Sequence, residues 1–185
     1  MLGQAFRRRF TAIGLTALVA ALIASALATP AAAREPEPGP PARAAAAADA
    51  LPCTRLVDID LLSQRLVASE CGQTFVTTPI TSGRPDLRTP TGTYTIFLRQ
   101  RDVYFYSPWP EGDPNYYPPM PVAYAIEFLD DGYFIHTDPD EPDGAYGPGS
   151  EDGPYASHGC VHVPYSAMAS LYEWAVEGTR VDIHY

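Results

Sequence analysis

The chain has 185 residues, enough for one folded domain with an additional segment but short for two domains. Its formal net charge at pH 7 is −10, and residues 53–185 contain seven Arg and no Lys against 19 Asp and Glu. Nucleic-acid binding requires a cationic surface, so this composition argues against nucleic acid or another strongly anionic polymer as the partner.

The first 33 residues have the three parts of a secretory signal peptide. Arginines at positions 7–9 form a basic start, residues 10–28 form an uncharged apolar run, and residues 31–33 are small residues at a cleavage point. We therefore predict that residues 1–33 are a signal peptide and that the protein is exported, either into the periplasmic or cell-wall space or out of the cell. The alternative is an uncleaved segment that anchors the protein, because the apolar run is near the length that spans a bilayer.

Residues 34–52 are rich in Pro and Ala and have few large apolar side chains, which predicts a linker. We expect the folded domain to comprise residues 53–185. Cys53 and Cys71 bracket a stretch that is predicted to form a hairpin, whose two ends would lie side by side. In an oxidising compartment these cysteines would form a disulfide and leave Cys160 as the odd thiol. The alternative is two unpaired buried cysteines.

Short alternating and β-branched runs predict a mainly β domain. The predicted strands are residues 56–60, 65–68, 75–78, 93–98, 103–106, 122–129, 132–137 and 179–184. Asp130-Asp131-Gly132 is typical of a tight turn between two of them. One helix is predicted to begin at Pro164 and to end at Gly178. Its apolar face is formed by Ala167, Leu171, Trp174 and Ala175.

Two long loops separate these elements. Residues 107–121 contain six prolines together with Trp109, Tyr116 and Tyr117, so the aromatic rings could be held rigidly as a lid or groove wall, or the loop could be merely structural. Residues 138–156 carry six acidic side chains, which we interpret as a solvated acidic loop. A calcium loop is disfavoured because Pro142 occupies a ligand position.

The most informative motif is Ser157-His158-Gly159-Cys160, preceded by His136 in an apolar, strand-like run. A thiol becomes a good nucleophile only as the thiolate, which needs a nearby imidazole or amide dipoles. Gly159 allows a tight turn that brings main-chain N–H groups close to the sulfur, as an oxyanion hole requires. The alternative is that Cys160 is a small buried apolar residue and that the histidines are hydrogen-bonded core groups.

The motif resembles the signature of the L,D-transpeptidase (YkuD-type) catalytic domain. The resemblance runs from about Leu56 to the C-terminus and includes Gln64, Ser82-Gly83, residues 88–94, Ser157-His158-Gly159-Cys160-Val161 and residues 177–181. It implies a β-sandwich of bent sheets with one packed α-helix. Two departures occur: His162 stands where the family usually has Asn or Arg, and the segment between His136 and Ser157 is longer than usual.

From their positions, we assign Cys160 as the nucleophile and His136 as the base that activates it. The resemblance implies that the backbone carbonyl of Thr137 orients the His136 ring. Backbone N–H groups of His158, Gly159 and Cys160 would stabilise the oxyanion, and His158 would shape the turn and contact the substrate. Ser157, His162 and Tyr133 are assigned to substrate binding. Neither a cofactor nor a metal ion is implied.

The implied substrate is a peptidoglycan stem tetrapeptide. The sulfur would attack the carbonyl of the third residue and expel the terminal D-Ala, leaving a thioester. An amine from a neighbouring stem peptide would then produce a cross-link between two third residues. With water as the acceptor, the enzyme would instead be an L,D-carboxypeptidase, and the sequence leaves both open.

Other classes of protein fit the motif less well. A sortase carries Thr-Leu-x-Thr-Cys rather than Ser-His-Gly before its cysteine, and an NlpC/P60-type peptidase places Cys before His. A zinc-binding module could use His158, Cys160 and His162 from one strand, with His136 as the fourth ligand. A catalytically inactive wall-associated domain is the remaining alternative.

Overall fold

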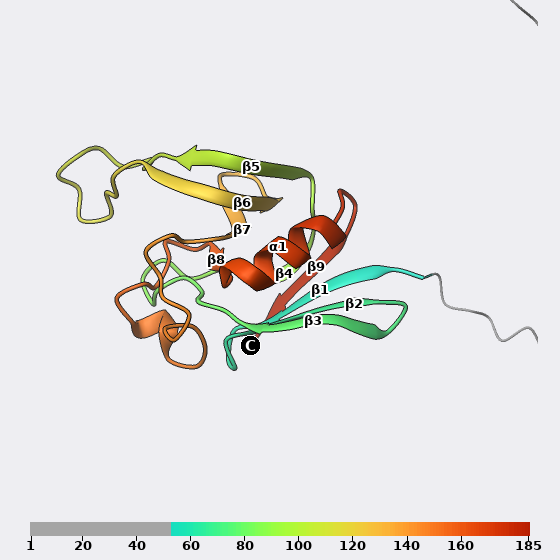
Figure 1. Cartoon of the computed structure of the whole chain (residues 1–185). Coiled ribbons are helices and arrows are strands. Elements are labelled where there is room, and N and C mark those ends of the chain that lie inside the picture. Colours follow the sequence, from blue (N-terminus) through green and yellow to red (C-terminus); the bar gives the residue numbers. More distant parts are fainter. Residues whose placement is uncertain (1–52) are drawn as a thin grey trace, which may run out of the picture. The chain divides into compact units, whose positions relative to one another are not determined.

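The computed structural model describes residues 53–185 (Figure 1). The predicted signal peptide, residues 1–33, and the predicted linker, residues 34–52, lie outside the described residues. Within residues 53–185, no helix combines the length and the apolar character that a membrane crossing needs.

The first sheet has five strands in the order β3-β2-β1-β9-β4. These strands are β1 (Arg55–Asp60), β2 (Arg65–Glu70), β3 (Gln73–Pro79), β4 (Gly92–Thr95) and β9 (Arg180–His184). β1, β2 and β3 form an antiparallel meander, whereas β9 enters beside β1 in parallel register. β9, the last strand of the domain, therefore lies between β1 and β4, which both come early in the domain.

The expected hairpin is formed by β1 and β2. Asp60 stabilises its turn, because one carboxylate oxygen accepts the N–H groups of Leu62 and Ser63 at 2.9 and 3.1 Å. At the open end, Cys53 and Cys71 are joined by a disulfide, with their Cα atoms 4.5 Å apart. The cross-link thus closes the hairpin at the end opposite its turn.

The second sheet has four strands in the order β5-β6-β7-β8. They are β5 (Leu98–Phe105), β6 (Met120–Leu129), β7 (Tyr133–His136) and β8 (Val161–His162). The predicted turn at residues 130–132 joins β6 to β7, with Asp131 and Gly132 both at positive φ. The single strand predicted for residues 93–98 is wrong. The chain leaves the first sheet after Thr95 and enters the second at Leu98, and between them Ile96 is 1% exposed in the core.

One α-helix, α1 (Tyr165–Trp174), lies between the two sheets and contacts β3 and β6 (Figure 1). Met168, Leu171 and Trp174 on this helix are buried in the core that both sheets share. The prediction that the helix extends to Gly178 is wrong. Arg55 donates a hydrogen bond of 2.7 Å to the carbonyl of Trp174, and the backbone is already extended at Ala175.

The architecture is therefore mainly β, with two bent sheets and one packed helix, as the sequence predicts. A small additional element, the 3-10 helix η1 (Ser150–Asp152), lies in the long segment before β8.

Candidate active site

The site lies where β7 ends beside β8. These two strands pair in parallel, and the register sets His136 opposite His162. Cys160 immediately precedes β8, so the pairing brings a cysteine and two histidines from distant parts of the chain to one edge of the sheet. All three line a cavity of about 520 Å³, and His158 and Ser157 line it too.

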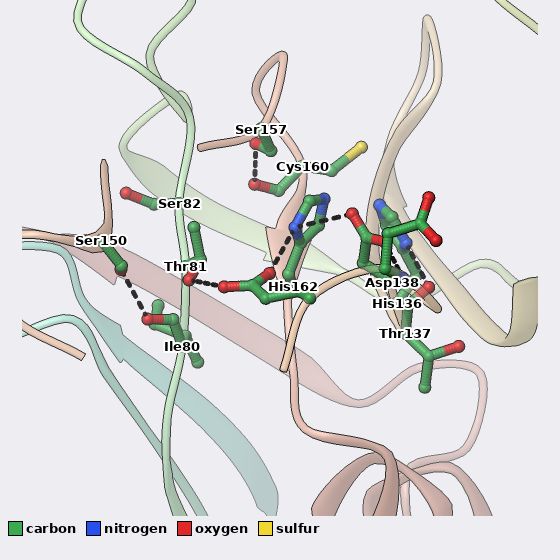
Figure 2. A network of polar contacts seen from close by, with 12 residues as sticks. Ile80, Thr81, Ser82, His136, Thr137, Asp138, Ser150, Ser157, Cys160 and His162 are labelled. Atoms are coloured by element: carbon green, nitrogen blue, oxygen red, sulfur yellow. Dashed lines mark hydrogen bonds and ion pairs between the residues drawn. The ribbon is translucent and has the colours of Figure 1, made fainter. Parts of the chain in front are cut away.

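Ser157 stabilises the turn that carries Cys160. Ser157 Oγ donates a hydrogen bond of 2.6 Å to the carbonyl of Cys160 and accepts the N–H of Gly159 at 3.0 Å (Figure 2). In this arrangement the Gly159 N–H is bonded to the Ser157 hydroxyl oxygen. The N–H groups of His158 and Cys160 remain as candidate donors.

Gly159 is required at its position for two reasons. Its φ of 119° lies in a region that L-residues rarely adopt, and a Cβ there would lie 2.8 Å from a ring carbon of Tyr133. Tyr133, which the sequence assigns to substrate binding, therefore packs against the back of the turn and is not among the residues that line the cavity.

A second segment supports the turn from the side. Ser157 N–H donates to the carbonyl of Ser82 at 3.1 Å, and Thr81 exchanges two backbone hydrogen bonds with His162. Gln64 fixes Ser82 in turn, because its amide accepts the Ser82 N–H at 2.9 Å and donates to the Ser82 hydroxyl at 2.8 Å. Gln64 is 1% exposed, so this support lies inside the protein.

His136 is buried at the inner end of the cavity, with 2% of its surface exposed. Its Nδ1 lies 3.0 Å from the carbonyl of Thr137. A carbonyl can only accept, so Nδ1 carries the proton and Nε2 is left as a proton acceptor. Burial, together with the nearby His162, lowers the pKa of His136 to about 3. The imidazole is therefore neutral at physiological pH.

The thiol of Cys160 is also neutral at rest. Burial raises its pKa to about 11, although the N–H of Phe134, at 3.4 Å from Sγ, favours the thiolate. Both shifts favour a neutral imidazole and a neutral thiol over a thiolate–imidazolium pair. In Figure 2 the free nitrogen of His136 points toward the part of the view that holds the Cys160 sulfur.

His158 is held between two aromatic rings of the proline-rich loop. The ring centroids of Trp109 and Tyr117 lie 5.3 and 5.5 Å from that of His158. Desolvation lowers the pKa of His158, and the charge of Arg84 lowers it further. The loop continues along the cavity through Pro118 and Pro119, and the start of β6 adds Met120 and Pro121, so these residues form one wall of the cavity.

The interpretation of residues 138–156 as a solvated acidic loop is wrong for two of its members. Glu141 is 6% exposed, accepts a hydrogen bond from the Thr81 hydroxyl and contacts His162 Nδ1 at 2.9 Å through its second oxygen. Asp138 lies 3.6 Å from the same nitrogen. The loop folds inward because a buried imidazole offers these carboxylates a partner.

Asp138, Glu141 and His162 have donor atoms within 4.8 Å of one another, and this is the group among residues 53–185 that could hold a metal ion. It shares only His162 with the zinc site considered from the sequence, which would have used His136, His158 and Cys160. The zinc-binding module is therefore not the arrangement that the fold assembles.

The fold and this site define a class of protein, and comparison with known proteins identifies it. Residues 54–183 match the family model of YkuD, the L,D-transpeptidase catalytic domain. The chain belongs to this family. A search of curated protein sequences found no match.

Solved structures of L,D-transpeptidases share this fold. An L,D-transpeptidase from Mycobacterium smegmatis is 24% identical, with a TM-score of 0.62 over 72% of this chain and 59% of that one. A mutant of the Enterococcus faecium L,D-transpeptidase is 25% identical, with a TM-score of 0.63 over 71% of this chain and 50% of that one. L,D-transpeptidase 3 from Mycobacterium tuberculosis, in complex with a faropenem-derived adduct, is 22% identical, with a TM-score of 0.62 over 72% and 61%. The chain thus matches between half and three-fifths of the length of these proteins.

Several residues of the site were not found from the sequence. Glu141 and Asp138 are acidic residues in a Pro-containing loop, and no periodic pattern distinguishes them from solvated neighbours. Thr81 lies immediately before Ser82-Gly83, and no feature of the neighbouring sequence marks it as part of the site. The one available signal was His162, because a histidine in place of the usual Asn or Arg implies a different partner.

Proposed function

We propose that this protein is a peptidoglycan L,D-transpeptidase that joins the third residues of two stem peptides through a Cys160 thioester. The family supports a peptidoglycan-directed enzyme of this kind. The observation that carries the proposal is that Cys160, His136 and His158 line one cavity, and that His136 Nδ1 lies at hydrogen-bond distance from the Thr137 carbonyl, which leaves Nε2 as the proton acceptor.

Acylation begins from two neutral groups. Sγ attacks the carbonyl carbon of the third stem residue while its proton passes to His136 Nε2, so that no free thiolate has to accumulate. The carbonyl of Thr137 accepts the Nδ1–H and stabilises the imidazolium that forms. His136 then gives the proton to the nitrogen of the departing D-Ala, and a thioester remains.

The tetrahedral intermediate carries a negative charge that must be stabilised. The N–H groups of His158 and Cys160 are the candidates, because Gly159 already donates to Ser157. One preorganised donor of this kind contributes about 3–4 kcal/mol to transition-state stabilisation. The serine, by fixing the turn, determines where these donors point.

Resolution of the thioester distinguishes two activities. An amine from a neighbouring stem gives a cross-link and water gives an L,D-carboxypeptidase product, from the same acyl-enzyme. The amide bond that is broken supplies the free energy for the bond that forms, so the exchange needs no ATP.

We further propose that residues 1–33 direct export and that residues 34–52 are a linker. A disulfide at the start of the folded region fits an oxidising compartment.

The experiment is incubation of the purified protein with disaccharide-tetrapeptide, followed by separation of the products. Release of D-Ala with dimer formation supports the transpeptidase. Release of D-Ala without dimer means a carboxypeptidase, and absence of both products from folded protein refutes the proposed function. The Cys160→Ala variant is the control, because it retains the cavity but lacks the sulfur.

A further inference from the structure

Two carboxylates meet one imidazole nitrogen beside the cavity. His162 Nδ1 lies 2.9 Å from a Glu141 oxygen and 3.6 Å from an Asp138 oxygen, and Figure 2 shows the contacts that converge on this nitrogen. An imidazole nitrogen carries at most one hydrogen, and 3.6 Å is beyond hydrogen-bond distance. The bond to Glu141 therefore leaves the Asp138 oxygen without a hydrogen from this ring. We refer to Asp138 and Glu141 as the acidic wall.

The acidic wall has little contact with water. The Glu141 side chain has no exposed surface, and the side chains of His162 and Asp138 are 7% and 13% exposed. Among residues 53–185, neither of the two cavities that these side chains line has a Lys or an Arg in its lining. A buried carboxylate is costly unless it is paired or coordinates a metal ion, and one imidazole cannot balance two carboxylates. A cation would balance the excess of negative charge.

The second oxygen of each carboxylate has a donor of its own. The hydroxyl of Thr81 donates to Glu141 Oε1, and the N–H of Asp140 donates to Asp138 Oδ1 at 2.9 Å. The other two oxygens, Glu141 Oε2 and Asp138 Oδ2, are those that face His162. Outer hydrogen bonds of this kind orient the ligands of metal ions in proteins. The two facing oxygens are therefore held in place by groups outside the site.

The three facing atoms have the spacing of a zinc site. In a tetrahedral Zn²⁺ site with bonds of about 2.0–2.1 Å, neighbouring ligand atoms lie about 3.3 Å apart. The two distances from His162 Nδ1, 2.9 and 3.6 Å, lie on either side of this value, and all three donor atoms lie within 4.8 Å of one another. Imidazole nitrogen and carboxylate oxygen are both zinc ligands, and three protein ligands leave a fourth position for water.

The acidic wall also begins the segment of residues 138–156, whose two ends line the active-site cavity. The middle of this segment is attached to Ile80, whose carbonyl accepts hydrogen bonds from the Gly147 N–H and the Ser150 hydroxyl. The start of the segment meets β8 through His162. An ion at this point would therefore fix the first part of a cavity wall to the strand that follows Cys160.

We propose that Asp138, Glu141 and His162 bind a Zn²⁺ ion, which joins the start of segment 138–156 to β8. The ion balances the two carboxylates, and Nδ1 gives up its hydrogen when its bond to the metal forms. The inference goes beyond the proposed function and does not depend on it, because neither Cys160 nor His136 is a ligand.

The first test measures zinc binding by the purified protein with its disulfide intact. The protein is stripped with a chelator, Zn²⁺ is titrated by calorimetry, and the bound metal is counted by mass spectrometry after gel filtration. Glu141→Gln keeps the size of the side chain but removes its charge. The matched control is Asp143→Asn, because Asp143 belongs to the same segment and lines the second cavity with Glu141 but is outside the ligand group.

We expect one ion per chain in wild type and in Asp143→Asn. Loss of an outer partner alone costs about 10- to 100-fold in metal affinity, so Thr81→Val should weaken binding by that factor and Glu141→Gln by at least ~100-fold. Near-ultraviolet circular dichroism of the stripped proteins verifies that each variant is folded. Absence of binding by wild type, or undiminished binding by Glu141→Gln, overturns the inference.

Co²⁺ as a spectroscopic probe separates this site from one that uses the cysteine. A thiolate bound to Co²⁺ gives an intense sulfur-to-metal charge-transfer band in the near ultraviolet, which nitrogen and oxygen ligands do not give. We expect the visible bands of a four-coordinate ion without that charge-transfer band, and the same spectrum in Cys160→Ala. A charge-transfer band that disappears in Cys160→Ala would place the ion at the cysteine and overturn the inference.

Hydrogen exchange tests the structural role of the ion. Zn²⁺ should slow the exchange of amides in residues 139–146 at least ~tenfold in wild type and leave it unchanged in Glu141→Gln. Residues 148–153, which are attached through Ile80, should change little. Unchanged exchange in residues 139–146 of zinc-bound wild type would overturn the attachment. None of these readouts involves D-Ala release, so failure of this inference is distinguishable from failure of the proposed function.

Discussion

The reactivity of Cys160 toward a small alkylating reagent should rise with pH and should not depend on His136. With a thiol pKa of about 11, the thiolate fraction at pH 7 is on the order of 10⁻⁴. Replacing His136 by Gln removes the base but not an ion pair, because burial keeps that imidazole neutral. Alkylation should therefore be almost unchanged, while D-Ala release should fall by roughly 10²- to 10⁴-fold, the usual contribution of a general base.

The assay is the rate of iodoacetamide addition to Cys160 between pH 6 and 10, followed by intact-protein mass spectrometry, in wild type and in His136→Gln. The expected rate increases about tenfold per pH unit, since only the thiolate reacts. Thermal melting of the variant verifies that it is folded. A rate that reaches a plateau below pH 8 in wild type and loses the plateau in the variant would show a thiolate–imidazolium pair and refute the reasoning.

Three further predictions concern the turn, the disulfide and the proline-rich loop. The Gly159→Ala variant should no longer release D-Ala, and its free energy of unfolding should fall by about 1–3 kcal/mol, because alanine would be strained at this φ and its Cβ would clash with the Tyr133 ring. Unaltered activity of the variant would contradict this reading. The double substitution Cys53→Ser and Cys71→Ser should lower the free energy of unfolding in urea by about 3 kcal/mol, and an unshifted midpoint would show that the cross-link contributes nothing. Deletion of residues 110–118 removes one of the rings against His158 and should reduce D-Ala release at least ~tenfold, so unchanged turnover would exclude a role for this wall.

Local patterns predicted the strands well, because each strand is a short alternating or β-branched run with a turn signal at its end. The turn at residues 130–132 is an example, since Asp131 and Gly132 both need positive φ. The break at residues 96–97 was missed because it is not local: Ile96 hydrogen bonds to Thr179 and Phe97 to Glu127, so the chain changes sheets in response to distant partners.

The helix end shows the same limit. Gly178 is the expected stop, but the helix ends at Trp174, where a distant arginine satisfies the terminal carbonyl. At the site, the motif itself indicated Cys160 and His136, because residue type and spacing carry that chemistry. The acidic wall could not be predicted, because the burial of Glu141 depends on where the loop folds back, and no residue near it in the sequence signals that contact.

The most direct test of the account is to identify the residue that carries the acyl group. Wild type is incubated with the tetrapeptide substrate, quenched in acid and digested, and the adduct is located by tandem mass spectrometry, with Cys160→Ser as the control. We predict that the stem tripeptide acyl group is found on the peptide that contains Cys160 and is absent from that peptide in the control. An adduct on another residue, or turnover by wild type without an adduct at Cys160, would contradict the central claim.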